Sequence, residues 1–311
     1  MAVSQKTMTA FLCNICDGLL IPRFPRVLDT NTDESFAVYR CVSCGLGHTI
    51  PQPDDLNQYY GENYYGGRHG FTASYCARRR LRIINSAIGT RSNRTLLDVG
   101  CGDGTLLTAA RAAGWTVFGT EIYPTIARGA NLDVRESIDQ LDDCAPFDCI
   151  TIWHGLEHLR DPHSTIIRLS GLLKPGGALV IAVPDSAGLQ AKIFGPNWFH
   201  LDVPRHLHHF DSVSLARLMN SAGLTIERKW HQELEYDLLG WSQSALNLLF
   251  PVPNSFFFAM TGRHPNTGKF TAMASVALGL VLSVLALPVV VLGTVLRRGG
   301  TLVMLARRSH R

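Results

Sequence analysis

Charged side chains are scarce in this chain of 311 residues: Asp, Glu, Lys and Arg make up 17% of it, against about 25% in an average soluble protein. The deficit is local, because residues 238–262 and residues 270–296 contain none of the four. Hydrophobic residues reach 46%, which excludes a disordered chain. A uniformly soluble enzyme is disfavoured too, since one region lacks the charges that a water-exposed surface normally carries.

A secretory signal is not recognisable in the sequence. The apolar run near Leu12 is broken by Asn14 and Asp17, and no cleavage site follows it. The eight cysteines, at positions 13, 16, 41, 44, 76, 101, 144 and 149, are too few and too irregularly spaced for a secreted disulfide scaffold. We therefore expect a reducing, cytosolic environment. The net charge of +4 is small and gives no argument for a nucleic-acid partner.

Residues 94–236 alternate short apolar runs with helical patterns. Such a series predicts an α/β fold with a mostly parallel, Rossmann-like sheet and helices on both of its faces. Asp161 followed by Pro162 is a typical helix start, and Gly223 is a typical helix end. The expected strands are 95–99, 116–120, 147–153, 178–183 and 224–232, and the expected helices are 106–113, 161–174 and 211–223.

The segment Leu96–Gly104 is the most informative part of the chain. Its glycines at alternate positions let the backbone turn sharply from a strand into a helix and let a ligand approach closely. The free N–H groups at the start of that helix suit a polar or anionic group. Asp98 precedes the turn, and Glu121 ends the next strand, 23 positions later. A carboxylate at that place can accept both hydroxyls of a ribose.

This turn, together with Phe147-Asp148, Leu156–Pro162 and Leu173–Gly177, resembles the class I S-adenosylmethionine-dependent methyltransferases, and most closely the branch of the ubiquinone-biosynthesis methyltransferases. The resemblance covers about residues 95–236 and the C-terminal strand. The alternative is a nicotinamide-binding or ligand-free Rossmann domain. The Gly-x-Gly-x-Gly spacing argues against it, because nicotinamide enzymes place the third glycine three residues after the second. The lack of a dehydrogenase-like catalytic domain argues against it as well.

The resemblance implies a seven-stranded sheet and S-adenosyl-L-methionine as the cofactor. The glycine turn would line the methionine and ribose parts, Asp98 would orient the amino group, and Glu121 would hold the ribose. Ile122 would flank the adenine, and Trp153 would sit near the sulfonium. The residue that reads the adenine amine stays open among Asp133, Arg135 and Ser137. The cofactor-binding residues expected are Asp98, Gly100, Cys101, Gly102, Gly104, Glu121, Ile122 and Trp153.

Two cysteine pairs, Cys13-x2-Cys16 and Cys41-x2-Cys44, form a metal-binding signature. Each pair makes a tight turn that points two thiolates at one ion, and four thiolates complete a tetrahedral Zn²⁺ site with no open position. We therefore expect a structural zinc ribbon over residues 1–50, because so short a segment buries little core without a metal. The alternative is four unliganded thiols. The other four cysteines are expected to be buried small residues.

Residues 197–210 are rich in histidines and aromatic residues and follow the strand that ends at Val183. In a sheet of this kind such a segment covers the acceptor pocket. Methyl transfer to a hydroxyl needs a base for the proton, and histidine has a suitable pKa. His206 or His208 is the candidate base, and His154 near the sulfonium is a further catalytic candidate. The alternative is that these histidines fix the loop by hydrogen bonds. On the histidine argument, we expect transfer to oxygen.

Three further groups have expected roles. Tyr64–Gly67 is expected to be part of a lid over the cofactor. Glu157-His158 opens the helix after the fourth strand and is expected to be structural or to support the acceptor. Four arginines crowd one short helix, either as a solvated face or as a contact with anionic lipid head groups or a phosphate-bearing substrate. They are Arg78, Arg79, Arg80 and Arg82.

The two uncharged stretches predict a membrane-associated insertion. Residues 270–296 would form a helix of ~40 Å, which is long enough to cross a hydrocarbon core. Pro288 is expected to kink or break that helix. Residues 238–262 are less apolar and are expected at the membrane interface, with Trp241 and Phe256–Phe258 as anchors.

Residues 301–307 have the pattern of the last methyltransferase strand, antiparallel to the strand before the insertion. The chain must then return to the side that it left, so the insertion is a helical hairpin or a re-entrant element. A hairpin in one leaflet is favoured over two full crossings, because Arg263 and Lys269 would otherwise lie outside. A buried hairpin of a soluble protein is the third alternative. Arg297 and Arg298 favour the cytoplasmic face.

The sequence thus predicts a membrane-associated methyltransferase with a cytoplasmic catalytic domain. The acceptor is expected to be lipid-linked or amphipathic, such as a quinone precursor or a polyprenyl-linked glycan. Two other classes remain: a non-catalytic cofactor-binding scaffold, and a protein or nucleic-acid methyltransferase that grips its target with the zinc ribbon. The near-neutral ribbon speaks against nucleic acid. The expected parts are the ribbon (1–50), a helical lid or linker (51–93), the methyltransferase domain (94–236), the hydrophobic insertion (237–300) and the last strand with its tail (301–311).

Overall fold

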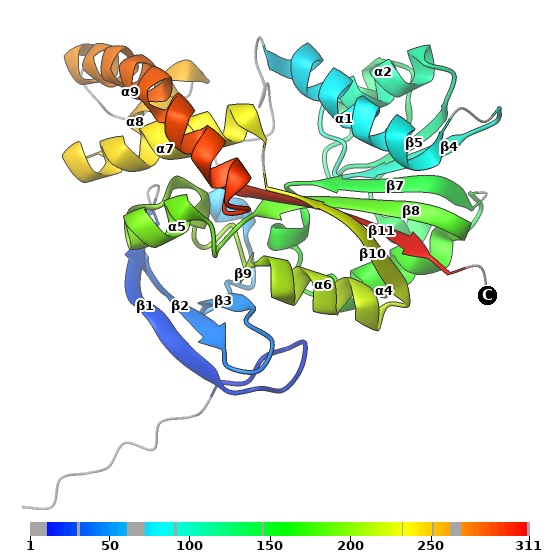
Figure 1. Ribbon diagram of the computed structural model, residues 1–311, viewed down its shortest axis with the longest axis horizontal. Helices are drawn as coiled ribbons and strands as arrows, with labels where there is room; N and C mark the ends of the chain where they lie inside the picture. The colour runs from blue at the N-terminus through cyan, green and yellow to red at the C-terminus, as the bar shows by residue number, and fades with distance from the viewer. Residues whose placement is uncertain are drawn as a thin grey trace, which may run out of the picture.

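The computed structural model describes residues 11–29, 32–60, 72–89, 92–144, 146–231, 233–250, 252–261 and 269–309. The expected lid segment Tyr64–Gly67 lies outside these residues. A seven-stranded sheet forms the centre of the molecule, in the order β10-β11-β8-β7-β4-β5-β6 (Figure 1). Its strands are β4 (Thr95–Val99), β5 (Thr116–Thr120), β6 (Asp133–Arg135), β7 (Phe147–Trp153), β8 (Leu173–Pro184), β10 (Leu224–Trp230) and β11 (Thr301–Arg308).

The strand directions are those of the predicted fold. Strands β6, β5, β4, β7 and β8 are parallel to one another, and β11 runs antiparallel between β8 and β10. The protein therefore has the Rossmann-like methyltransferase fold, and its last strand pairs antiparallel with β10, as predicted. The carboxyl ends of β4 and β5 lie at one edge, where ligands bind in open α/β sheets.

Helices cover both faces of this sheet (Figure 1). Helices α1 (Ala73–Ile88) and α2 (Thr105–Ala112) pack on one face, and α4 (Pro162–Leu172) and α6 (Ser212–Ser221) pack on the other. Asp161 and Asp211 begin α4 and α6, because each carboxylate accepts a hydrogen bond from the backbone N–H three residues on. Shorter elements are α3 (Thr125–Gly129), α5 (Leu189–Phe194), η1 (Asn57–Tyr59), η3 (Ile138–Gln140), η4 (Leu156–His158), η5 (Gly195–Asn197) and η6 (Phe199–Leu201).

The predicted bounds hold best for the buried strands. Strands β4, β5 and β7 have the predicted ends. Strand β8 instead starts at Leu173, within the predicted helix, because Leu173 already pairs with Phe147 of β7. The prediction placed the helix end at Lys174 and so ran two residues too far.

A second sheet holds the N-terminal region. It is antiparallel and consists of β1 (Leu20–Leu28), β2 (Ser35–Cys41), β3 (Gly47–Ile50) and β9 (His208–His209), in that order. Strand β9 comes from the loop after β8, and His208 pairs with His48. The ribbon is therefore not confined to residues 1–50, since its last strand belongs to the methyltransferase chain segment.

The insertion between β10 and β11 consists of α7 (Leu234–Leu249), α8 (Ser255–Met260) and α9 (Lys269–Val295). Helix α9 packs against α7 and α8, and the chain returns to the central sheet (Figure 1). The predicted hairpin-like insertion is thus present. Pro288 does not break α9, which continues from Lys269 to Val295 with this proline inside it.

Of the expected interface anchors, only Phe256 is buried, against Gly279 of α9. Trp241 packs edge-to-face on Phe194, with ring centroids 5.4 Å apart, and is half-buried. Phe257 and Phe258 are half-buried too. The burial of Phe256 rules it out as an anchor, and the role of the other three stays a prediction. Within the described ranges, one helix is long and apolar enough to cross a membrane, Phe270–Val295.

Candidate active site

The glycine turn after β4 has the conformation that its sequence requires. Gly100, Gly102 and Gly104 have φ angles of 72°, 58° and 77°, a region that other residues rarely adopt. The N–H groups of Gly100 and Cys101 donate to the carbonyl of Thr120, at 2.8 and 2.9 Å. These bonds tie the turn to the end of β5. The turn thereby lies beside the residue that follows Thr120.

That residue, Glu121, is held over the turn. Its carboxylate accepts hydrogen bonds from the N–H groups of Gly102, at 2.9 Å, and Ile122, at 2.8 Å. Asp98, at the end of β4, is buried and accepts a hydrogen bond of 2.6 Å from the Thr151 hydroxyl. Burial raises the pKa of Asp98 to about 6. Two carboxylates from neighbouring strands therefore flank one turn.

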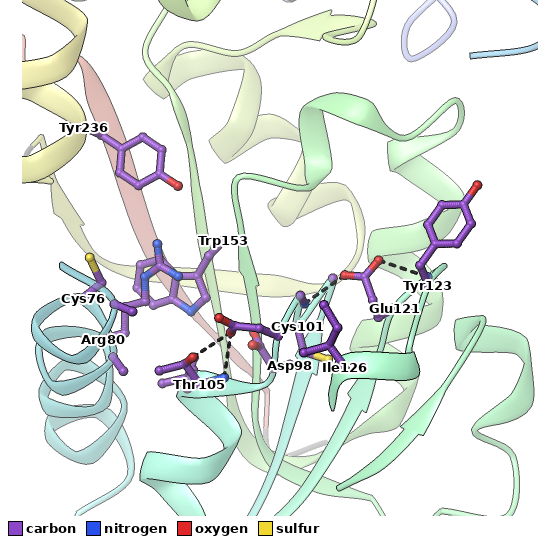
Figure 2. Close-up of a pocket in the computed structure, with 16 residues that line it drawn as sticks. Cys76, Arg80, Asp98, Cys101, Thr105, Glu121, Tyr123, Ile126, Trp153 and Tyr236 are labelled. Atoms are coloured by element: carbon purple, nitrogen blue, oxygen red, sulfur yellow. Dashed lines mark hydrogen bonds between the residues drawn. The ribbon is translucent and has the colours of Figure 1, made fainter. Parts of the chain in front are cut away.

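Both carboxylates line one cavity, between α1 and the carboxyl ends of β4, β5 and β7. Figure 2 shows side chains of α1 on one side, those after β5 on the other, and Asp98 and Cys101 between them. Six of the predicted cofactor residues line it: Asp98, Gly100, Cys101, Gly102, Glu121 and Trp153. Residues that the sequence did not single out for the cofactor also line it, among them Cys76, Arg80, Tyr123, Ile126 and Tyr236.

Two predicted cofactor residues do not line the cavity. The Ile122 side chain is 67% exposed, whereas Tyr123 and Ile126 line the cavity. Gly104 precedes α2, and a Cβ atom there would come within 2.4 Å of Leu132. Close packing and a positive φ therefore both require glycine at position 104.

Arg80 is buried at the cavity wall. Its guanidinium lies 4.9 Å from the centre of the Trp153 ring, as Figure 2 shows, and forms an ion pair of 3.5 Å with Glu233. Arg80 Nε and Nη2 and Trp153 Nε1 have no hydrogen-bond partner among the described residues. Buried donors without partners are costly, so this corner suits a polar ligand that accepts hydrogen bonds.

Sequence signals for the additional residues differ in strength. Arg80 shares a helix face with Cys76, Ile84 and Ile88, at four-residue spacing, and a lone arginine on an apolar face marks a buried charge. Tyr236 carries no such signal, because α7 reaches the cavity from a distant part of the chain. Of the remaining arginines of α1, Arg79 pairs with Glu233 and Glu235, while Arg78 and Arg82 are exposed.

His154 is buried beside the cavity but does not line it. Its Nε2 lies 2.5 Å from a Glu233 oxygen, its Nδ1 lies 3.8 Å from Glu157, and its ring stacks on Tyr236 with centroids 4.0 Å apart. Burial alone would lower its pKa, but Glu233 and Glu157 outweigh burial and raise the pKa of His154 to about 9. A protonated imidazole in an ion pair is not a general base; the role expected for His154 near the sulfonium stays a prediction.

The candidate bases His206 and His208 lie outside the cavity wall. His208 is 1% exposed, sits in β9, and bonds to the Asn14 amide at 3.2 Å. His206 bonds through Nδ1 to the carbonyl of His200, at 2.9 Å. Both histidines thus fix the loop onto its surroundings, as the alternative prediction stated. Neither histidine is among the residues that line the cofactor cavity, and a role of either as the base stays a prediction.

A cluster of possible metal ligands surrounds His206. One ligand atom from each of Glu157, His158 and His206 lies within 4.8 Å of the others. The Glu157 carboxylate is 1% exposed, and its oxygens have no hydrogen-bond partner among the described residues. His158 Nδ1 lies 2.9 Å from the carbonyl of Arg205. Carboxylate and imidazole groups are common ligands of divalent cations, so three such groups gathered at one point could hold a divalent ion.

The four N-terminal cysteines converge as the sequence predicted. Cys13 and Cys44 have their sulfurs 3.6 Å apart, Cys16 and Cys41 have theirs 3.5 Å apart, and all four lie within 4.8 Å of one another. Zn–S bonds of about 2.3 Å in a tetrahedron require S–S distances of about 3.8 Å. The cluster therefore fits a tetrahedral zinc ion. Cys76, Cys101 and Cys149 are buried, and Cys144 is half-buried.

Comparisons with known proteins agree with this fold and cavity. The family model of the methyltransferase domain matches residues 68–229, just over half of the chain. The ubiquinone biosynthesis O-methyltransferase of Xanthomonas axonopodis pv. citri (strain 306) is 28% identical over 166 residues, which are 48% of this chain and 69% of that protein. That of Xylella fastidiosa (strain M23) is 30% identical, over 48% and 67%.

Among solved structures, a SAM-dependent methyltransferase from Archaeoglobus fulgidus is 19% identical, with a TM-score of 0.47, over 82% of this chain and all of that one. The family match covers the glycine turn, both carboxylates and Trp153. A nicotinamide-binding domain is thereby discarded. The chain belongs to the methyltransferase-domain family and is a class I S-adenosylmethionine-dependent methyltransferase.

Proposed function

We propose that this protein transfers a methyl group from S-adenosylmethionine to an oxygen of a lipid-linked or amphipathic acceptor, a small molecule or a glycan, at the cytoplasmic surface of a membrane. The observation that carries the proposal is the single cavity in which the glycine turn, Asp98 and Glu121 lie opposite Arg80 and Trp153. Transfer to oxygen is supported by the relatives, which are O-methyltransferases by name.

The polar groups of the cavity fit the cofactor. Glu121 would accept the ribose hydroxyls, Asp98 would accept the amino group, and Arg80 would bind the carboxylate. Tyr123 and Ile126 would flank the adenine in place of Ile122. When bound, S-adenosylmethionine supplies a methyl group activated by a sulfonium. The chain's own task is to align the acceptor with that methyl group and to exclude water.

The insertion supports a membrane acceptor. Tyr236, in the first turn of α7, lines the cofactor cavity, and the same insertion continues into the apolar helix α9. An acceptor with an apolar part could therefore meet the cavity where the insertion begins. The zinc ion that the cysteine cluster fits would be structural, because four thiolates leave no open position.

A labelling experiment tests the proposal. The purified protein is incubated with methyl-labelled S-adenosylmethionine and, separately, with a membrane lipid extract, total protein and total RNA. We expect label in the lipid extract, as a product heavier by one methyl group. Binding of S-adenosylhomocysteine without label in any fraction would indicate a cofactor-binding scaffold. Label in protein or RNA would indicate a macromolecular target gripped by the ribbon.

A further inference from the structure

Helix α9 is covered by protein along one side only. Its buried residues are three, four or seven positions apart and are mostly small, so they form one face. They are Ser275, Gly279, Ala286, Val290 and Gly293. At Gly279 a Cβ atom would come within 2.5 Å of the Phe256 ring. At its C-terminal end, the carbonyl of Arg298 accepts a hydrogen bond of 2.9 Å from the N–H of Leu189. The rest of the protein therefore contacts α9 along one face, from Ser275 to its C-terminal end.

Helix α7, on which α9 packs, is held to the rest of the protein by hydrogen bonds. The Ser244 hydroxyl accepts from the N–H of Phe199, at 2.9 Å, and the Asn247 amide donates to the carbonyl of Asn197, at 3.2 Å. The carbonyl of Asp237 accepts from the Gln190 amide at 2.8 Å. Figure 1 shows α7 between α5 and α9. These bonds hold α7 to α5 and to the loop 195–201, whose Pro196 and Asn197 are exposed, so α7 cannot enter the hydrocarbon without drawing this water-exposed loop in with it.

The other side of α9 is an uninterrupted apolar surface. Its most exposed side chains include Phe270 at 85%, Met273 at 72%, Val284 at 65% and Val295 at 73%. Arg297 and Arg298 follow directly and are exposed. A helix of this composition on its own would span a bilayer. Here it cannot do so without drawing α7 and the polar loop 195–201 into the hydrocarbon.

We propose that the exposed face of α9 docks in the plane of one bilayer leaflet, with Arg297 and Arg298 at anionic head groups. The proposal deepens the proposed function, on which its membrane site of action rests. A second copy of the chain is a poor occupant. A stripe ~40 Å long and about 10 Å wide covers about 400 Å² per partner, half of the roughly 800 Å² of a stable interface.

In-plane docking of α9 would also fix the position of the active site relative to the membrane surface. Glu233 and Tyr236 begin α7, and Tyr236 lines the cofactor cavity. The docked insertion thereby holds the cavity at a fixed position relative to the leaflet. An acceptor with a lipid tail can reach it without leaving the membrane.

Vesicle flotation tests the docking face. Val284→Glu and Val291→Glu place a charge on it, and we expect each to weaken binding to vesicles of phosphatidylcholine with phosphatidylglycerol at least about tenfold. Ile193→Glu and Val213→Glu change equally exposed residues of α5 and α6, and binding should persist. Pure phosphatidylcholine should bind the wild type more weakly. Equal binding by wild type and α9 variants would overturn the proposal, as would a dimer that only the α9 variants dissociate.

Protease protection separates one leaflet from a full crossing. A protease recognition sequence is inserted after Thr261, and the protein is produced in a bacterial host whose membranes are converted to sealed inside-out vesicles. We expect cleavage without detergent, as for the same insertion after Ser309. Protection until detergent is added means that α9 spans the membrane and overturns the proposal. Binding of S-adenosylhomocysteine, measured on the same samples, shows that the methyltransferase domain is folded, so failure of docking remains distinct from failure of the proposed methyl transfer.

Discussion

Glu121 is hydrogen-bonded to the backbone of the glycine turn and also lines the cofactor cavity. Its carboxylate already accepts from two backbone N–H groups, so its orientation is set before a ligand binds. Asp98 is set in the same way by Thr151. Preorganised charge of this kind spares the entropy of ordering a side chain on binding. At the scale of single residues, cofactor affinity should therefore depend on these two acids in different ways.

For Glu121→Ala we expect the affinity for S-adenosylhomocysteine to fall about 10- to 100-fold, because hydrogen bonds to a charged group contribute about 1.5–3 kcal/mol. Titration calorimetry measures it. Glu227→Ala is the matched control, since Glu227 in β10 is an exposed partner of Arg307 and does not line the cavity. Comparable affinities of the two variants would contradict the role of Glu121. A thermal melt of each variant separates loss of binding from loss of folding.

Asp98 predicts a pH dependence of cofactor affinity. Its pKa is about 6 because it is buried, and only the ionised carboxylate attracts the ligand's ammonium group. Affinity for S-adenosylhomocysteine should therefore be constant above about pH 7 and fall by up to tenfold per unit below pH 6. In Asp98→Asn we expect weaker binding without this slope. A slope of the same size in the variant would assign the titration to another group.

The residue scale also separates what the sequence could predict from what it could not. Asp98, the glycine turn and Glu121 follow one another along β4 and β5, so local pattern sufficed. Arg80 was one of four clustered arginines, and only burial distinguishes it from the exposed Arg78. For His206 and His208 the residue type suggested a base, whereas only the fold shows their contacts with Asn14 and with the carbonyl of His200.

Among the elements, buried strands were the most predictable. A continuous apolar run between turn residues leaves β4, β5 and β7 little freedom in their bounds. Strand β9, with two residues, has no periodicity and forms only because β3 offers an edge to the loop after β8. The ribbon sheet and the methyltransferase domain are consequently coupled through His208 and His209. Destabilising the ribbon should then also lower the stability of the methyltransferase domain.

Zinc removal tests this coupling. For Cys41→Ser we expect loss of bound zinc and a melting temperature lower by more than about 5 °C, because the metal replaces the core that the ribbon lacks. Elemental analysis and a thermal melt measure the two effects. Cys144→Ser, which changes a half-buried cysteine outside the cluster, should keep the zinc. Full zinc content in the Cys41 variant would show that the four thiols do not share an ion.

On the scale of the whole molecule, Glu233 joins three parts. It precedes α7 of the insertion, pairs with Arg79 and Arg80 of α1, and pairs with His154 after β7. These groups are buried, so the cluster is a charged core between the membrane-docking insertion and the cofactor cavity. Breaking a buried pair by removing one partner costs about 3–5 kcal/mol. Glu233→Gln should therefore loosen the insertion and the cavity together.

The cluster also predicts how stability depends on pH. Glu233 and Glu157 raise the pKa of His154 to about 9 from its usual 6.5. The contribution of the protonated histidine is therefore complete below about pH 6.5 and is lost as the pH rises through 9. Burial raises the pKa of Asp237 to about 8. Ionisation of Asp237 therefore also lowers the stability of the protein as the pH rises to about 8. Only a comparison of wild type with variants separates the contribution of the histidine from that of Asp237. We expect the wild-type melting temperature to fall more steeply between pH 6.5 and 9.5 than that of His154→Gln or Glu233→Gln, both of which should start lower. Parallel curves for wild type and variants would mean that His154 is neutral in the folded protein, and would leave only the ion pairs of Glu233 with Arg79 and Arg80 to join the insertion to the cavity.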